Sequence, residues 1–354
     1  MNARYSGAFA AVLAAVLFGA TTPFAKALLG ALSPFMVAGL FYLGSGGGLA
    51  IAMFVRRLRR KPNAHDHDHH PMPVTELPWL IGAIVAGGIA GPSLLMFGLS
   101  VTPAATASLL LNLEGVFTAL IAWFVFRENV DARVFIGMLA IVAGGALLSW
   151  QPGGSGAGAG ASLVALACLC WAVDNNLTRK VSNNDAVFIA CVKGLTAGIV
   201  NTGIALLSGA HMPGVGLIAA SMVAGWAGYG VSLVLFVVAL RHLGTARTGA
   251  YFSVAPLCGV AISFALWPER PPLSFWIAAA LMALGVWLHL RERHVHEHTH
   301  EALDHNHRHR HDEHHQHPHD FDWDGAEPHA HPHSHTPITH THAHFPDIHH
   351  RHPH

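Results

Sequence analysis

The sequence predicts an all-α integral membrane protein with ten transmembrane helices arranged as a five-plus-five inverted repeat. Three observations lead to this prediction. Of the 354 residues, 52% are hydrophobic and only 11% are charged, whereas soluble domains carry about 25% charged residues. The apolar residues form runs long enough to cross a bilayer, and the second half of the chain repeats features of the first. This composition excludes an ordinary soluble protein.

Charge and cysteine content narrow the class further. The chain has 20 basic and 20 acidic residues, so its formal net charge is zero. A nucleic-acid partner would require a positive excess to neutralise phosphates, and we expect none here. The cysteines all lie in apolar runs, where we expect small buried thiols rather than disulfides or a redox centre. They are Cys168, Cys170, Cys191 and Cys258.

Ten apolar runs have the length of a membrane span. A helix needs about 20 mostly apolar residues to cross the hydrocarbon core. The first run follows Arg4 and has some features of a signal peptide, but it lacks a convincing small-residue cleavage site and has a counterpart later in the chain. The predicted spans are 7–28, 33–55, 77–99, 104–126, 133–150, 160–180, 185–208, 216–240, 246–267 and 273–290.

Basic residues predict the orientation of these spans. If the N-terminus is inside, the outer loops carry almost nothing basic beyond Arg270, which is the asymmetry of the positive-inside rule. We therefore expect a multi-pass protein of the inner or plasma membrane with both termini in the cytoplasm. The inner basic residues are then Arg4, 56–61, Arg127, Arg133, Arg179, Lys180, Arg241, Arg247, Arg291 and Arg293.

Matches between the two halves indicate a duplication. Phe18 corresponds to Trp171, and Lys26 corresponds to Arg179 at the same spacing. Because each copy has five spans, the second copy must enter the membrane from the opposite side. Inverted repeats of this kind are typical of transporters with alternating access. Further matches are Gly7-Ala8 with Gly160-Ala161, 91–97 with 230–236, Thr106-Ala107 with Thr245-Ala246, and 126–128 with 268–270.

These matched stretches, together with 137–145, resemble the EamA-type branch of the drug/metabolite transporter superfamily over about residues 5–292. The resemblance implies secondary transport of small metabolites, often efflux. Members of this branch usually carry proline about 13 residues before the glutamate that closes the fourth and ninth spans. Pro256 before Glu269 fits this pattern, whereas the first copy has Gly115 at the matching place, directly after Glu114.

Three charged residues lie near the middle of predicted spans: Glu114, Asp174 and Lys193. A charge near the bilayer centre costs about 2.5–3.5 kcal/mol on insertion scales, so each needs a partner or a water-filled cavity. One hypothesis is a central cavity in which Lys193 faces an anionic group while Glu114 and Asp174 take up protons or bind a cation. The alternative is a purely structural pair of Lys193 with Glu114 or Asp174. The polar residues expected beside them are Asn112, Asn175, Asn176 and Tyr251.

Several other features have simpler interpretations. Lys26, Arg179 and Lys180 lie near helix ends, where we expect their side chains to reach the membrane interface. The glycine-rich stretch 153–160 has no phosphate-binding lysine after it, so it is expected to link the two copies.

Histidine is concentrated in two short segments. All but His211, His242 and His289 of the 30 histidines fall within 65–70 and 294–354. Neutral imidazole is a common ligand of nickel, cobalt and zinc, so both segments are expected to bind transition-metal ions, although no cofactor is required. The tail has few large apolar residues and is expected to be disordered. The candidate ligands are His65, His67, His69, His70, His305, His307, His309 and His311.

The sequence therefore predicts a first repeat over 1–150, a second over 151–293 and a histidine-rich cytoplasmic tail over 294–354. We expect a secondary transporter that exports a small molecule or ion across the lipid bilayer and is linked to transition-metal ions. The alternative is a membrane-anchored metal-binding or sensing protein whose spans do not transport. An enzyme is not expected, since the spans contain neither a paired His-Glu zinc motif nor a Ser-His-Asp arrangement.

Overall fold

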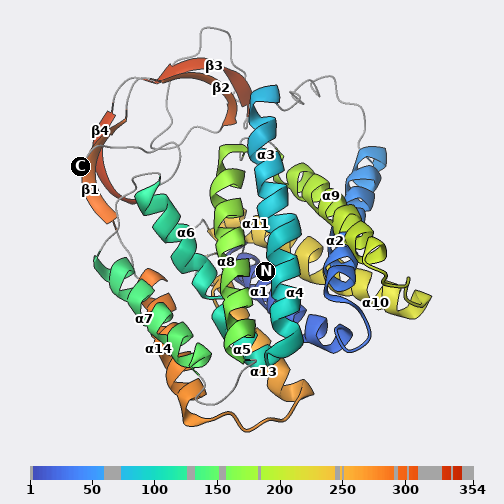
Figure 1. Ribbon diagram of the computed structural model, residues 1–354. Helices are drawn as coiled ribbons and strands as arrows, with labels where there is room; N and C mark the ends of the chain where they lie inside the picture. Colours follow the sequence, from blue (N-terminus) through green and yellow to red (C-terminus); the bar gives the residue numbers. More distant parts are fainter. Residues whose placement is uncertain are drawn as a thin grey trace. The chain divides into compact units, whose positions relative to one another are not determined.

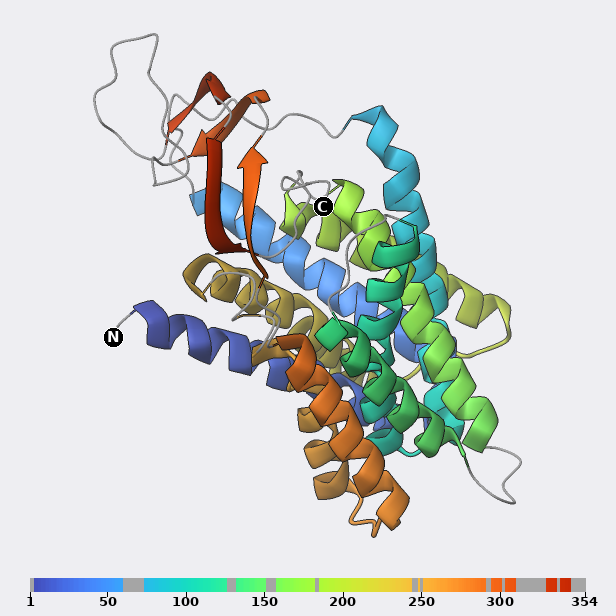
Figure 2. The same ribbon diagram turned by 90° about the vertical axis from the view of Figure 1, so that its left-hand side faces the viewer.

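The computed structural model describes residues 3–59, 73–125, 132–150, 157–181, 185–243, 248, 251–290, 294–300, 303–309, 329–335 and 338–344. The chain divides into two units, Met1–Arg291 and Glu292–His354. The first is a bundle of helices (Figures 1 and 2).

The first copy contains α1 (Ala3–Leu28), α2 (Pro34–Arg59), η1 (Val74–Glu76), α3 (Leu77–Ala83), η2 (Ile84–Ala90), α4 (Gly91–Val101), α5 (Ala104–Leu110), α6 (Leu113–Phe124) and α7 (Ala132–Ser149). The second copy contains α8 (Ala157–Thr178), η3 (Arg179–Val181), α9 (Ala186–Leu207), α10 (Val215–Gly225), η4 (Trp226–Val231), α11 (Ser232–Leu243), α13 (Ala255–Leu266) and α14 (Leu273–Leu290).

Helix packing follows the inverted repeat. Helix α1 of the first copy packs on α11 and α13 of the second, and α8 of the second packs on α4 and α6 of the first. The second helices of the two copies, α2 and α9, pack on each other, as do the fifth helices, α7 and α14. Each copy therefore covers the apolar face of the other, and the fold is an all-α repeat of two inverted halves.

Among the residues that the structure describes, eight helical segments are long and apolar enough to cross a membrane, and two shorter apolar helices occupy the places of the ninth and tenth predicted spans. The third span in each copy contains a π-helical segment, η2 or η4. The fourth span is not one helix, because a turn at 111–112 separates α5 from α6. There the side-chain amide of Asn112 donates to the Leu109 carbonyl, which favours a turn over continued helix.

Close helix contact in the centre depends on glycine. In α2, a Cβ added to Gly46 would lie 2.5 Å from the backbone nitrogen of Leu195 in α9. A Cβ added to Gly194 would in turn lie 2.8 Å from Cα of Gly46. Only glycine lets the two backbones approach this closely, as at other small-residue interfaces in membranes. This contact fixes the centre of the bundle around which the site is built.

The tail contains four strands, β1 (His294–His300), β2 (Leu303–His309), β3 (His329–His335) and β4 (Ile338–His344). Strand β1 pairs antiparallel with β4, and β2 pairs antiparallel with β3. These strands lie in the segment for which the composition predicts disorder, and that expectation stays a prediction. Each strand satisfies backbone hydrogen bonds only with its one partner.

Candidate functional site

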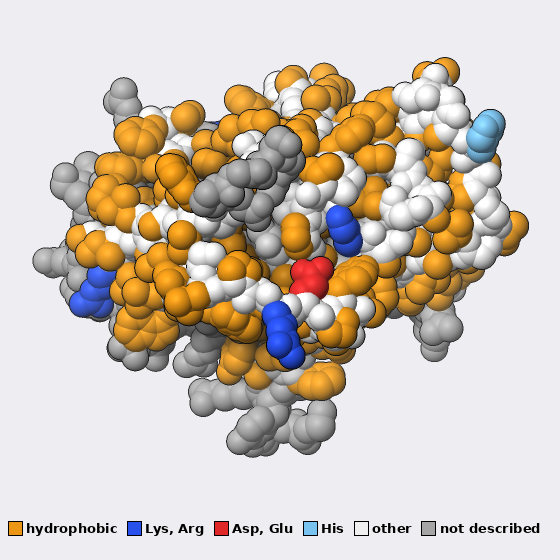
Figure 3. All heavy atoms as spheres, turned by 60° about the horizontal axis from the view of Figure 1, so that its bottom comes forward, with side chains coloured by type: hydrophobic (Ala, Val, Ile, Leu, Met, Phe, Trp, Pro, Cys, Tyr) orange, Lys and Arg blue, Asp and Glu red, His pale blue; other side chains and the backbone are white. Residues whose placement is uncertain are grey.

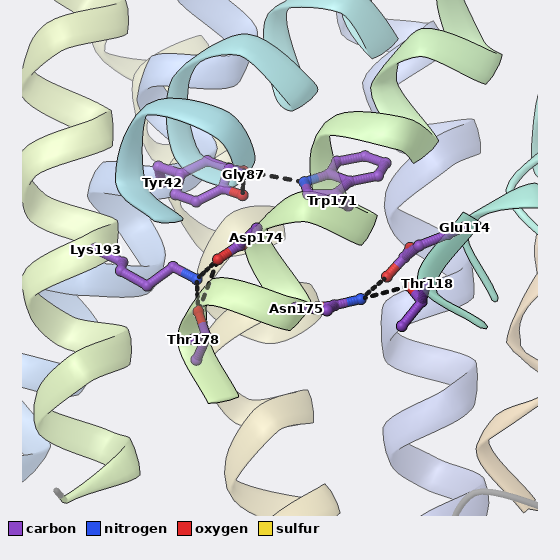
Figure 4. Close-up of polar contacts among 9 residues, drawn as sticks. All are labelled: Tyr42, Gly87, Glu114, Thr118, Trp171, Asp174, Asn175, Thr178 and Lys193. Atoms are coloured by element: carbon purple, nitrogen blue, oxygen red, sulfur yellow. Dashed lines mark hydrogen bonds and ion pairs between the residues drawn. The ribbon is translucent and has the colours of Figure 1, made fainter. Parts of the chain in front are cut away.

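Helix α8 carries polar side chains on two sides of its last two turns. Asp174 is directed toward Lys193 of α9, while Asn175 is directed toward Glu114 of α6 (Figure 4). Successive helical residues are about 100° apart, so neighbours in sequence serve different sides of the helix. The three charged residues expected in the membrane therefore divide into two clusters, one that pairs two charges and one that contains a single carboxylate.

The first cluster is an ion pair within the second copy. Lys193 Nζ lies 2.5 Å from Asp174 Oδ1. Thr178 donates a 2.8 Å hydrogen bond from Oγ1 to the same Asp174 oxygen, and Lys193 donates to Thr178 Oγ1 over 3.2 Å. Asp174 itself is only 7% exposed. Of the pairings left open by the sequence, the structure has Lys193 with Asp174, and the pair joins α8 to α9.

Gly87, in the π-helical segment η2, lies against this ion pair. A Cβ added there would overlap the Asp174 carboxylate. The Gly87 carbonyl accepts two side-chain hydrogen bonds, from Tyr42 Oη at 2.9 Å and from Trp171 Nε1 at 3.0 Å. π-Helical turns occur frequently at functional sites because they displace the regular backbone hydrogen bonds. Here the Gly87 carbonyl joins the third span to both α2 and α8.

The second cluster contains Glu114. Asn175 Nδ2 donates to Glu114 Oε1 over 2.9 Å and lies 3.4 Å from Thr118 Oγ1. The adjacent Asn176 is 4% exposed and donates to the backbone carbonyls of Ala172 and Thr118. No ion pair of Glu114 with a lysine, arginine or histidine occurs within the described ranges. The carboxylate thus has an amide donor but no cationic partner there.

The face of α8 that packs into the protein is buried over the first half of the helix and exposed near the C-terminal end of the helix. On that face Val164 and Cys168 are 0% exposed, whereas Asn175 is exposed. Exposed apolar residues such as Leu166 lie on the opposite face, where lipid contact is expected. Asn175 is therefore an exposed polar position on this face, in contact with Glu114, which is itself only partly exposed. In Figure 1, α6 diverges from α8 toward this end.

The matching contact in the other copy is closed. By the spacing that pairs Phe18 with Trp171, the counterpart of Asn175 is Thr22, which is 2% exposed. A Cβ added to Gly19 in the same helix would overlap the Ala255 carbonyl of α13. The α1–α13 contact is therefore tight, whereas the α8 position that contacts Glu114 of α6 is exposed.

Aromatic rings connect the two halves near these clusters. Tyr229 of η4 lies 5.4 Å from Tyr42 and 6.0 Å from Phe18, measured between ring centroids. Phe252 lies 5.4 Å from Phe18. The sequence reasoning did not identify Tyr42, Trp171 or Gly87 as neighbours of the charged residues. Only the repeat match of Trp171 with Phe18 indicated that position.

Two other expected site residues lie apart from the clusters. Asn112 caps the turn between α5 and α6 and lies 4.0 Å from the Met282 sulfur of α14. Tyr251 is 40% exposed, at the start of the ninth span. No group of three or more potential metal ligands is found within the described ranges. Three of the predicted histidine ligands belong to strand β2, namely His305, His307 and His309. The others lie outside the described ranges and are His65, His67, His69, His70 and His311.

An inverted pair of five-helix copies with charged groups between its helices is the architecture of a multi-pass membrane transporter. The family model of the EamA-like transporter family matches residues 5–150 and again residues 158–291, so the chain belongs to this family. The protein is 25% identical over 302 residues to an uncharacterized transporter of Methanothermobacter thermautotrophicus, covering 80% of this chain and 86% of that protein. A solved crystal structure with 17% identity has the same fold, with a TM-score of 0.57 over 79% of this chain and 95% of the other.

Proposed function

We propose that this membrane transporter is a secondary exporter of a small solute, and that Glu114 is the group through which a proton or another cation couples to transport. The observation that supports this is the difference between the two carboxylates. Asp174 is paired with Lys193, whereas Glu114 receives a hydrogen bond from Asn175 and has no cationic partner within the described residues.

The charge balance explains why this difference matters. The Asp174–Lys193 pair is neutral as a unit, so it can stay in the membrane through a transport cycle without exchanging an ion. An ionised Glu114 leaves one negative charge, which is costly in the hydrocarbon core unless a cation or proton neutralises it. Asn175, which donates to Glu114, is itself exposed at the protein surface, so an ion would have a short path to the carboxylate. Release of a proton from Glu114 would thus change the net charge of the site from zero to minus one, and binding of a proton would restore it to zero.

The metal link is proposed for the histidine-rich segments rather than for the helical bundle. The described part of the bundle has no group of three metal ligands, so coordination of a transition metal there is not supported. We propose that 65–70 and the tail bind nickel, cobalt or zinc on the cytoplasmic side and deliver, sense or buffer the ion. Metal ions bound to these cytoplasmic segments would be available to a transporter that works outward, because export takes its solute from the cytoplasm.

Flux in sealed proteoliposomes tests the function. Wild-type protein should move a solute from a panel of amino acids and of nickel, cobalt and zinc ions, and an imposed pH gradient should change the rate. Glu114→Gln keeps the size and the contact with Asn175 but cannot release a proton, so it should abolish the response to the gradient. Glu76→Gln, a matched change outside the membrane core at the start of α3, should leave the response unchanged.

Two results would count against the proposal. A normal pH response in a well-inserted Glu114→Gln protein would remove Glu114 as the coupling group. No flux of any panel member, combined with metal binding by the intact chain, would favour the alternative of a membrane-anchored metal-binding or sensing protein.

A further inference from the structure

Lys26 does not reach freely to the membrane interface, as the sequence suggests, but binds the end of another helix. Its Nζ donates to the Leu99 carbonyl over 2.5 Å and lies 3.3 Å from the Ser100 carbonyl. Both carbonyls belong to the last turn of α4, where backbone oxygens lack partners within the helix. Pro103 follows, and α4 ends before it. Lys26 therefore caps α4 at its negative end.

This contact adds to the packing between two helices whose main partners differ. Helix α1, which carries Lys26, packs mainly on α11 and α13 (the α1 group), whereas α4 packs mainly on α8 (the α8 group), and the direct contact between α1 and α4 is smaller. The Lys26 ammonium thus joins the α1 group to the α8 group at the end of the molecule opposite to the accessible Asn175. An ammonium bound to two carbonyls across such a boundary resists separation of the groups at that end.

A small cavity lies beside the contact and contains a second charged group. Its volume is about 70 Å³, and its lining includes Lys26, Ser263, Trp267 and Glu269. Glu269 follows α13, so it belongs to the α1 group and stays near Lys26 if α4 moves away. On this face, acidic and basic side chains lie close together within a largely apolar surface (Figure 3).

We propose that Lys26 is the latch of a gate between α1 and α4 at this end of the molecule. While the Lys26 ammonium is bound to the α4 carbonyls the gate is closed, and when the gate opens the Glu269 carboxylate accepts the ammonium. The inference rests on the proposed transport function, because only a transporter needs to open both ends in turn. The closed α1–α13 contact around Gly19 and Thr22 is on the latched side. The exposed Asn175 beside Glu114 lies toward the other end of the bundle.

The latch can be tested by the accessibility of one cysteine. Ser263 lines the cavity and is 3% exposed, so Ser263→Cys in a cysteine-free background reports opening without a large change in volume. A membrane-impermeant maleimide, added to the face that bears the α1–α2 connection, should label it slowly. His211→Cys, on an exposed connection, should be labelled at one rate in every variant and serves as the control.

Lys26→Met should raise the rate of labelling at position 263 about tenfold, since a charge-assisted hydrogen bond biases a two-state equilibrium by about that factor. Lys26→Arg should keep the slow rate, because a guanidinium also donates to carbonyls. Glu269→Gln should lower the rate, because the released ammonium then meets a neutral amide oxygen in place of a carboxylate and forms a weaker hydrogen bond. The labelling experiments need no transported solute. The proposal for Lys26 can therefore be wrong while the proposed transport function is right, and the transport function can be wrong while the proposal for Lys26 is right.

An unchanged rate in a folded Lys26→Met protein would overturn the latch. If Lys26→Met does not fold, the Glu269→Gln variant decides: a faster or unchanged rate would contradict the role of Glu269 as acceptor and with it the proposal.

Discussion

Lys193 Nζ and Asp174 Oδ1 lie 2.5 Å apart and join the consecutive helices α9 and α8, so the two charges neutralise each other inside the bundle. Of the three charged residues near the middle of the spans, Glu114 is the one without an oppositely charged partner among the described residues. The ion pair thus accounts for two of the three charges, and the coupling role that we propose is assigned to the third.

The first prediction concerns this pair. Lys193→Met should destabilise the protein by about 3–5 kcal/mol, because it leaves the Asp174 carboxylate buried and unpaired. Adding Asp174→Asn in the double variant should restore most of the lost stability, since no uncompensated charge remains. Thermal unfolding in detergent measures both. Equal stability of the single variant and wild type would show that the pair does not stabilise the fold.

The second prediction concerns Gly87. Gly87→Ala places a methyl group into the Asp174 carboxylate and should cost about 1–3 kcal/mol, the usual range for overpacking. Gly47→Ala is a matched change in α2, where an added Cβ has no atom within 4 Å, and it should be neutral or slightly stabilising. The unfolding temperatures of the two variants in the same detergent provide the test. The same loss in both would point to a general effect of glycine replacement.

The third prediction separates two adjacent asparagines. Asn175→Ala removes the donor to Glu114 from an exposed position, so it should change the pH dependence of flux with little effect on stability. Asn176→Ala removes a buried contact between α8 and the Thr118 carbonyl, so it should lower stability by about 1 kcal/mol. Flux and unfolding are measured on both proteins. If Asn175→Ala lowered stability and Asn176→Ala changed the pH dependence of flux, the assignment of the two sides of α8 would be wrong.

The fourth prediction concerns the histidine-rich tail. Deleting residues 294–354 should leave the helical bundle folded, because the two units are separate in the structure. The full-length protein should bind several nickel, cobalt or zinc ions and the truncated protein few. Affinity should fall as the pH drops below about 6.5, the ordinary pKa of imidazole, because protonated imidazole cannot ligate metal. Equal stoichiometry in the two proteins, measured by titration calorimetry, would rule out the tail as the binding segment.

The sequence was most informative where the signal is summed over many residues. Hydrophobic runs predict the helical class, and the repeat is confirmed by the two matches of the family model and by the exchange of packing partners between copies. Local breaks were less predictable. The Asn112 side chain bonds to the Leu109 carbonyl at the turn, and in the π-helical segments the backbone hydrogen bonds shift locally. Neither change leaves a periodic pattern in the sequence.

The sequence by itself determined which charged residues must be explained, because Glu114, Asp174 and Lys193 lie within apolar runs where charge is costly. Only the tertiary structure decided how they are divided. Asp174 meets Lys193, 19 positions away, and Asn175 meets Glu114, 61 positions away. Which residues meet depends on the rotation of each helix about its axis, and that rotation is set by the packing of glycine faces between helices. The same reason placed Lys26 on the carbonyls of α4: its position near a helix end is visible in the sequence, but the helix end that it binds is fixed by packing.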